Sequence, residues 1–125
     1  MPFDGSVYED RVRSLDKMDK VIGLLSDETR WCKMELRTLD GRYCIAGAIV
    51  AVDAITETKN AILLAIEQVT GDYCRSIESF NDHRLTTHAL VLKVLSQARE
   101  NILSDTSTAT EQRVGAWARF GRFFG

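Results

Sequence analysis

The chain has 125 residues, a formal net charge of −2 and a sequence pI near 5.7. This length predicts one domain over residues 1–125, because too few residues are left to bury a second core. The weakly acidic balance argues against a general binder of phosphate backbones, so nucleic acid is not a favoured partner. A hydrophobic content of 45% with a single proline is typical of a globular chain and argues against disorder.

The cysteines and the N-terminal residues indicate the compartment. Three cysteines are an odd number for disulfide pairing, and we expect reduced thiols in a cytoplasmic protein. Asp4, Glu9 and Asp10 stand where a signal peptide would carry its positive charges and apolar stretch. The longest apolar run, residues 45–52, is too short to cross a bilayer. We therefore expect no membrane span.

The first predicted element is an amphipathic helix. Charged residues separate its apolar residues, which recur at helical spacing at Leu15, Met18, Ile22 and Leu25. Ser14 is the expected N-cap, and Ser26-Asp27 is the expected stop.

A two-residue period follows this helix. Apolar and charged side chains alternate over residues 32–37, which is the pattern of a half-buried strand. Asp40-Gly41 is a turn signal, and Arg42-Tyr43 follows it as a short return strand. We therefore expect one small β-hairpin that packs on helices.

Helical spacing returns at Cys44 and predicts a central helix whose other faces carry small residues, with an apolar face of Ile45, Ala48, Ile49, Val52 and Ile55. Thr58 is the expected N-cap of the next helix, which ends at Gly71 and turns inward Ile62, Ala65, Ile66 and Val69.

Residues 72–85 show no sustained period and predict a polar loop anchored by Ile77 and Phe80. Thr86 or Thr87 should cap a long helix with the inward residues Leu90, Val91, Val94, Leu95, Ala98 and Ile102. Residues 104–110 indicate a linker, and Thr110 should cap a last helix. The predicted fold class is mainly α, a compact bundle of about five helices with one small β-hairpin inserted.

The sequence also resembles a family of small bacterial and phage-borne proteins of unknown function. The resemblance rests on Trp31 after the first helix, on the stretch 40–49 with Cys44 opening a helix before Gly47-Ala48, and on the loop 76–82 with Phe80-Asn81-Asp82. It covers about residues 15 to 103, and it departs from the family at Phe80, where the family usually has tryptophan. The resemblance implies a fold and a compartment but no mechanism.

Cys44 is the candidate nucleophile of the sequence. A helix N-terminus lowers the pKa of a thiol, with His83 or His88 available as base and Asn81 or Asp82 as the residue that orients it. The alternative is a small apolar residue packed between helices, which is what free cysteines usually are, and we favour this alternative.

A metal site is a weaker hypothesis. Zinc would need four ligands from Cys32, Cys44, Cys74, His83 and His88, but no closely spaced Cys or His pair is present to hold two ligands on one turn. We expect neither a metal nor another cofactor.

The cluster Asn81, Asp82, His83 and Arg84 offers donors, acceptors and both signs of charge to a ligand or partner. Asn and Asp side chains also bond nearby backbone N–H groups, and we favour that structural role.

The segment 110–125 is the candidate partner-binding surface. It places basic side chains among more aromatic rings than one helix needs for packing, namely Arg119 and Arg122 among Trp117, Phe120, Phe123 and Phe124. The alternatives are docking on its own domain and lying on a membrane surface.

The preferred hypothesis is a non-enzymatic protein-interaction module that self-associates or binds another protein. A phage or mobile-element protein that acts on a host protein is an extension of it. The alternative is a small hydrolase or transferase that uses Cys44.

Overall fold

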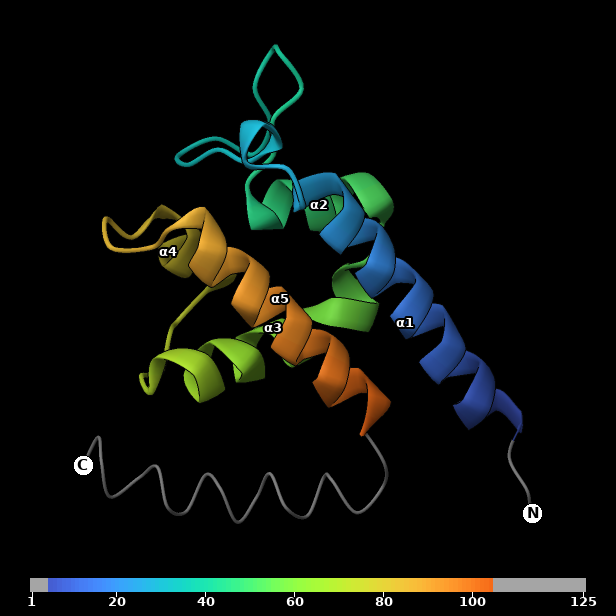
Figure 1. The fold of residues 1–125 in the computed structure, drawn as a ribbon. Helices are drawn as coiled ribbons and strands as arrows, with labels where there is room; N and C mark the ends of the chain where they lie inside the picture. Colours follow the sequence, from blue (N-terminus) through green and yellow to red (C-terminus); the bar gives the residue numbers. More distant parts are fainter. Residues whose placement is uncertain (1–4, 105–125) are drawn as a thin grey trace.

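The computed structural model of the protein describes residues 5–104, and within this range it has five α-helices and one 3-10 turn (Figure 1). In chain order the elements are α1 (Gly5–Leu25), the 3-10 turn η1 (Glu28–Arg30), α2 (Ile45–Val52), α3 (Ile55–Thr70), α4 (Ile77–Asp82) and α5 (His88–Leu103). The mainly α fold class is therefore confirmed. The predicted extent of one domain over 1–125 stays a prediction, because residues 105–125 lie outside the described range.

The core forms where α5 packs against both α1 and α3. The helical spacing predicted for α5 is confirmed, since its inward residues are buried, namely Val91, Val94, Leu95, Ala98 and Ile102. The residues that oppose them are Met18, Val21 and Leu25 of α1 and Ile62, Ala65 and Ile66 of α3. Each large apolar side chain buried in this way contributes about 1.5–3 kcal/mol to folding.

Helix α2 is short, and its end is fixed by α1. Asp53 closes the helix in the left-handed conformation at φ 58°. Lys17 of α1 donates from Nζ to the carbonyl oxygens of Val52 and Asp53, over 3.1 and 2.8 Å. A cation at carbonyl groups left without helical partners is favourable, so Lys17 stabilises the corner between α2 and α3.

Two predicted helix starts are wrong. Helix α1 begins at Gly5 rather than after Ser14. Helix α3 begins at Ile55, after Ala54, and not after Thr58. Thr58 is buried inside the helix, where its hydroxyl donates to the carbonyl oxygen of Ala54 over 2.7 Å. A hydroxyl bonded in this way does not serve as an N-cap.

The predicted β-hairpin is also wrong. Within residues 5–104 there are only two isolated bridges, in which Tyr43 pairs with Trp31 in parallel and with Arg37 antiparallel. Met34 lies in the left-handed region at φ 71°, which breaks an extended strand in the middle of the alternating segment. The Asp40-Gly41 turn does form, with Gly41 at φ 88°. The segment is thus an irregular loop.

A short helix takes the place of the middle of the predicted polar loop. Ser76 caps α4 by accepting a hydrogen bond from the backbone N–H of Ser79 over 3.1 Å. The predicted anchors Ile77 and Phe80 are both buried in the core. Six residues are too few to show a helical repeat in the sequence, which is why the pattern indicated only a loop.

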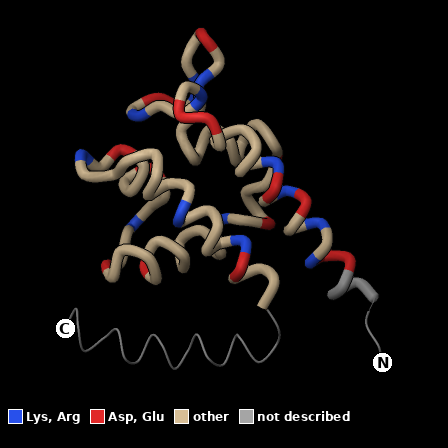
Figure 2. The backbone as a smooth tube through the Cα atoms, in the orientation of Figure 1, with Lys and Arg blue, Asp and Glu red and all other residues tan. Residues whose placement is uncertain are grey.

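Charged residues of both signs alternate along α1 and around the loop that precedes α2 (Figure 2). One ion pair joins two helices, Arg99 of α5 to Asp19 of α1, over 2.7 Å. Both side chains are exposed, so this pair contributes little to stability. None of the helices described is long and apolar enough to cross a membrane.

Candidate functional site

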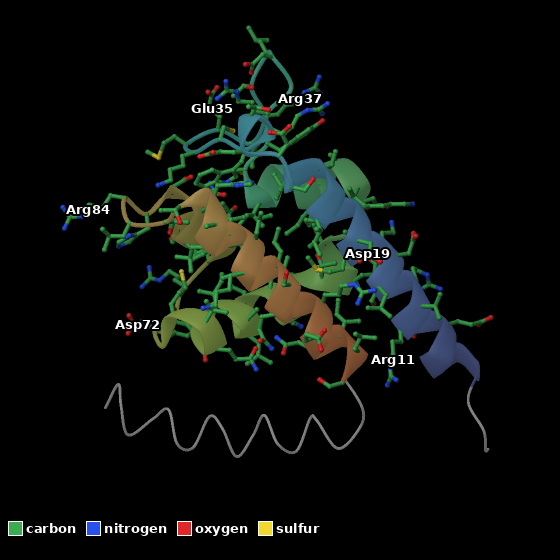
Figure 3. All side chains as sticks on the ribbon, viewed as in Figure 1. Arg11, Asp19, Glu35, Arg37, Asp72 and Arg84 are labelled. Carbon is green, nitrogen blue, oxygen red and sulfur yellow. The ribbon has the colours of Figure 1, made fainter. Side chains whose placement is uncertain are left out.

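The segment between η1 and α2 rises beyond one end of the helices (Figure 1). We call residues 32–43 the anchored loop, because the helices beneath hold it at several points. In Figure 3 the side chains of the loop point outward, and Glu35 and Arg37 are directed away from the helices. The loop projects beyond the packed helices in this view, and the residues that fix it form the candidate site.

Asn81 of α4 is the centre of the anchor and is fully buried. Its Oδ1 accepts hydrogen bonds from Trp31 Nε1 over 2.8 Å and from the backbone N–H of Ile45 over 3.1 Å. Its Nδ2 donates to the carbonyl oxygen of Cys32 over 3.1 Å and to Asp82 Oδ1 over 2.9 Å. Both lone-pair directions and both hydrogens of the carboxamide therefore have partners, so burial of this polar group carries no unmet desolvation cost.

The neighbours of Asn81 hold the next part of the loop. Asp82 Oδ1 also accepts the backbone N–H of Met34 over 2.8 Å. Lys33 Nζ donates to the carbonyl oxygen of His83 over 2.7 Å and lies 5.6 Å from the centroid of the Trp31 ring. Three consecutive loop residues are thereby tied to the end of α4.

Gly47 of α2 lets the second half of the loop approach the helix closely. A Cβ at this position would lie 1.8 Å from the carbonyl oxygen of Leu36. The same oxygen accepts the backbone N–H of Cys44 over 3.3 Å. No side chain fits between α2 and the loop here, so glycine is required by the contact itself.

The loop nevertheless turns its large apolar side chains outward. Met34 is 76% exposed, Leu36 is 55% exposed and Leu39 is fully exposed. The left-handed backbone of Met34 is unfavourable for a side chain of this kind and is held by the bond to Asp82. A fixed backbone that presents exposed apolar groups has the character of a binding surface.

Cys44 is buried, with only 3% of its surface exposed. Its Sγ accepts the backbone N–H of Gly47 over 3.2 Å, which makes it the N-cap of α2. Burial raises the pKa of the thiol, and the hydrogen bonds from Gly47 and Ala46 lower it by a smaller amount. Desolvation thus outweighs the helix N-terminus that the sequence suggested would activate this cysteine.

The histidines have other partners. His83 is exposed, and its Nδ1 accepts the backbone N–H of Leu85 over 3.1 Å. His88 Nε2 is 2.7 Å from the carbonyl oxygen of Leu25, at the end of α1, and its ring lies 5.9 Å from that of Trp31. Within residues 5–104 neither histidine is hydrogen-bonded to Cys44.

The metal-site candidates do not converge. Of the described residues, which include all five candidate ligands, no three His, Cys, Asp or Glu side chains are grouped so that they could hold a metal ion. Cys32 Sγ donates to the carbonyl oxygen of Glu35, and Cys74 Sγ donates to that of Ser76, over 3.4 and 3.2 Å.

The predicted cluster 81–84 thus divides into two parts. Asn81 and Asp82 face inward and hold the loop, whereas His83 and Arg84 are exposed on the surface beside it. The residues predicted for partner binding in the segment 110–125 lie outside the described residues. The sequence analysis did not identify Met34, Lys33 or Gly47 as site residues. For Met34 and Lys33, the only signal in the sequence was the alternation of apolar and charged residues over 32–37.

A comparison with protein-family models finds a match over residues 11–101 to a family described as of unknown function (DUF6197). The search of curated proteins finds no match, and the search of solved structures finds none. The matched region begins in α1 and ends near the C-terminus of α5, so it includes the whole anchor and the loop.

Proposed function

The chain belongs to the family of unknown function DUF6197, and we propose that it is a non-enzymatic protein-interaction module that contacts a partner protein through the anchored loop. The observation that carries this proposal is the contrast between the backbone and the side chains of the anchored loop. Its backbone is fixed by hydrogen bonds to the buried Asn81 and to Asp82, while the side chains of Met34, Leu36 and Leu39 are exposed to solvent.

This contrast matters energetically. A loop that is already ordered loses little conformational entropy when it binds, so more of the contact energy appears as affinity. Exposed methionine and leucine side chains gain free energy when a partner removes them from water, and methionine adapts to the shape of the surface that it meets. The charged residues that alternate with them, Glu35 and Arg37, would form the polar rim of such an interface.

The properties of Cys44 argue against the alternative of a cysteine-dependent hydrolase or transferase. A nucleophilic thiol is activated by a base or by a lowered pKa. Cys44 is buried, its pKa is raised by burial, and its Sγ is engaged with the backbone N–H of Gly47. We therefore keep the interaction module as the proposed function.

The resemblance noted in the sequence refines the proposal. If the protein is borne by a phage or another mobile element, its partner would be a host protein met in the cytoplasm. The segment 110–125 would be a second surface, used for self-association, because its four aromatic rings exceed what packing requires.

The test is a pull-down from source cells with the tagged full chain and with a double variant, Met34→Asn with Leu39→Gln. Asparagine tolerates the left-handed conformation of residue 34, so the loop should keep its shape. We expect the variant to lose at least one protein that the natural chain retains, and to lose at least about tenfold in affinity for that protein once it is purified.

The matched control is Val12→Gln with Ile55→Gln. These residues are 48% and 52% exposed and lie on α1 and at the start of α3, away from the loop in sequence. The control should retain the same protein as the natural chain. If the loop variant retains every protein that the natural chain binds, or if the control loses the same protein, the loop is not the binding surface.

A further inference from the structure

Cys32 is the first residue of the anchored loop, and Cys44 directly follows its last residue. The backbone N–H of Tyr43 donates to the carbonyl oxygen of Arg30 over 2.8 Å, and the backbone N–H of Cys32 donates to that of Tyr43 over 3.0 Å. These two bonds make the parallel bridge between Trp31 and Tyr43. Cys32 follows Trp31 and Cys44 follows Tyr43, so the two cysteines are the next pair in the register of this bridge.

Extended by one residue, the register of this isolated bridge places Cys32 beside Cys44. Parallel neighbours lie about 4.8 Å apart, and residues in register point to the same face. A disulfide joins residues whose Cα atoms are about 4.4–6.8 Å apart. The charge of Cys44 is also one of the causes that raise the pKa of Cys32, as expected for two thiols that are close neighbours.

We propose that Cys32 and Cys44 are a site of reversible oxidation, at which a disulfide closes the base of the anchored loop. Both are free thiols in the structure. With a peroxide as oxidant, the more exposed Cys32 attacks first, and its sulfur becomes a sulfenic acid as the peroxide O–O bond breaks and one water leaves. Cys44 then attacks that sulfur, the S–S bond forms, and a second water leaves.

The surroundings of the thiols make this reaction slow at neutral pH. Burial raises the pKa of both Cys32 and Cys44, so few molecules carry the reactive thiolate. The site would therefore respond to sustained oxidation and not to a brief pulse. Below the pKa of the attacking thiol, each unit of added pH raises its thiolate fraction about tenfold, and the rate of disulfide formation should rise with it.

The local contacts that must be given up are few. Cys44 Sγ releases the backbone N–H of Gly47, and Cys32 Sγ releases the carbonyl oxygen of Glu35. The ties to Asn81 do not involve either sulfur, so the loop can keep its anchor while the disulfide forms. An effect of the disulfide on partner binding would rest on the proposed function, but its formation would not.

The experiment uses the full chain, treated with hydrogen peroxide at pH 7 and at pH 8.5, alkylated to block remaining thiols and digested with trypsin. Cleavage after Arg30, Lys33, Arg42 and Lys59 separates the two cysteines. We expect the peptides 31–33 and 43–59 to be joined, with a mass lower than their sum by two hydrogen atoms. The joined pair should form at least tenfold faster at pH 8.5 and disappear with dithiothreitol.

Matched variants distinguish this pair from the third cysteine. Cys74→Ser should form the joined peptides at the rate of the natural chain. Cys44→Ser should form none and should stay folded, because serine is a good N-cap and can accept the N–H of Gly47. Cys32→Ser is the second variant with the same expectation. A joined peptide that contains Cys74, or oxidation of Cys32 to sulfinic acid without any joined peptide, would overturn the proposal.

Discussion

Asn81 uses both functional groups of its side chain to connect segments that are far apart in the sequence. Trp31 and Cys32 precede it by about fifty residues, and Ile45 precedes it by 36. It is one of the few polar side chains buried completely, and each of its hydrogen-bonding directions is used. A hydrophobic residue in its place would leave the buried backbone N–H of Ile45 and the partly buried Nε1 of Trp31 without their acceptor.

We therefore predict that Asn81→Ala lowers the free energy of unfolding by about 3 kcal/mol, because a buried donor without an acceptor costs about 1–3 kcal/mol. Urea denaturation followed by circular dichroism measures the change. The matched control is Asn101→Ala, which also removes an amide that bonds three partners, Ala61, Gln68 and Gln97. Asn101 is only partly buried, and its loss should cost less than about 1 kcal/mol. Equal losses for the two variants would contradict the anchor.

At this scale the sequence predicts types of residue better than it predicts their partners. The polar cluster 81–84 stood out in the sequence, where a local role in a turn and helix entry was favoured; the structure instead has Asn81 and Asp82 bonded to the distant backbone N–H groups of Ile45 and Met34. The partners could not be predicted, because no local pattern relates Asn81 to Trp31. Burial raises the pKa of the Cys44 thiol. A helix start predicted from the sequence does not reveal that burial.

At the scale of elements, the anchored loop shows why an alternating pattern does not always give a strand. The pattern over 32–37 predicts a hairpin when its apolar side chains can be buried on one face. Here Met34 and Leu36 face solvent, and α4 supplies side-chain and backbone acceptors to the loop. Tertiary contacts, in particular the close approach of the loop to Gly47, take the place of the hydrogen bonds between paired strands. The long helices were predictable, because their apolar stripes are sustained over several turns.

The contact at Gly47 gives a prediction about the loop as an element. Gly47→Ala places a methyl group against the carbonyl group of Leu36, so either the loop or α2 must move. We expect a loss of about 2 kcal/mol or more in the free energy of unfolding, together with faster hydrogen exchange at the backbone N–H groups of residues 32 and 44.

The control for this prediction is Gly23→Ala in α1. Gly23 is also a helical glycine, but a Cβ there meets nothing within 4 Å. The higher helix propensity of alanine should therefore raise stability by about 0.5–1 kcal/mol. A Gly47→Ala protein that is as stable as the natural chain, with unchanged exchange in the loop, would show that the loop does not depend on this contact.

At the scale of the whole molecule, the buried core draws its residues from Met18 to Ile102. All five described helices contribute to it, and the match to the family covers residues 11–101. Within the described residues 5–104, the core and the anchored loop are built from residues 18–102.

We predict from this that the chain truncated after Ser107 folds and is monomeric, whereas the full chain self-associates through residues 108–125. The removed rings, Trp117, Phe120, Phe123 and Phe124, would bury apolar area between copies, with Arg119 and Arg122 beside them. Size-exclusion chromatography with light scattering measures the mass of each form, and circular dichroism checks that the truncated chain is helical. The full chain with Met34→Asn and Leu39→Gln is the matched control and should keep the larger mass, because its substitutions lie on the anchored loop. A folded monomer in both the full and the truncated chain would count against the segment as an interface, while leaving the proposed role of the loop to its own test.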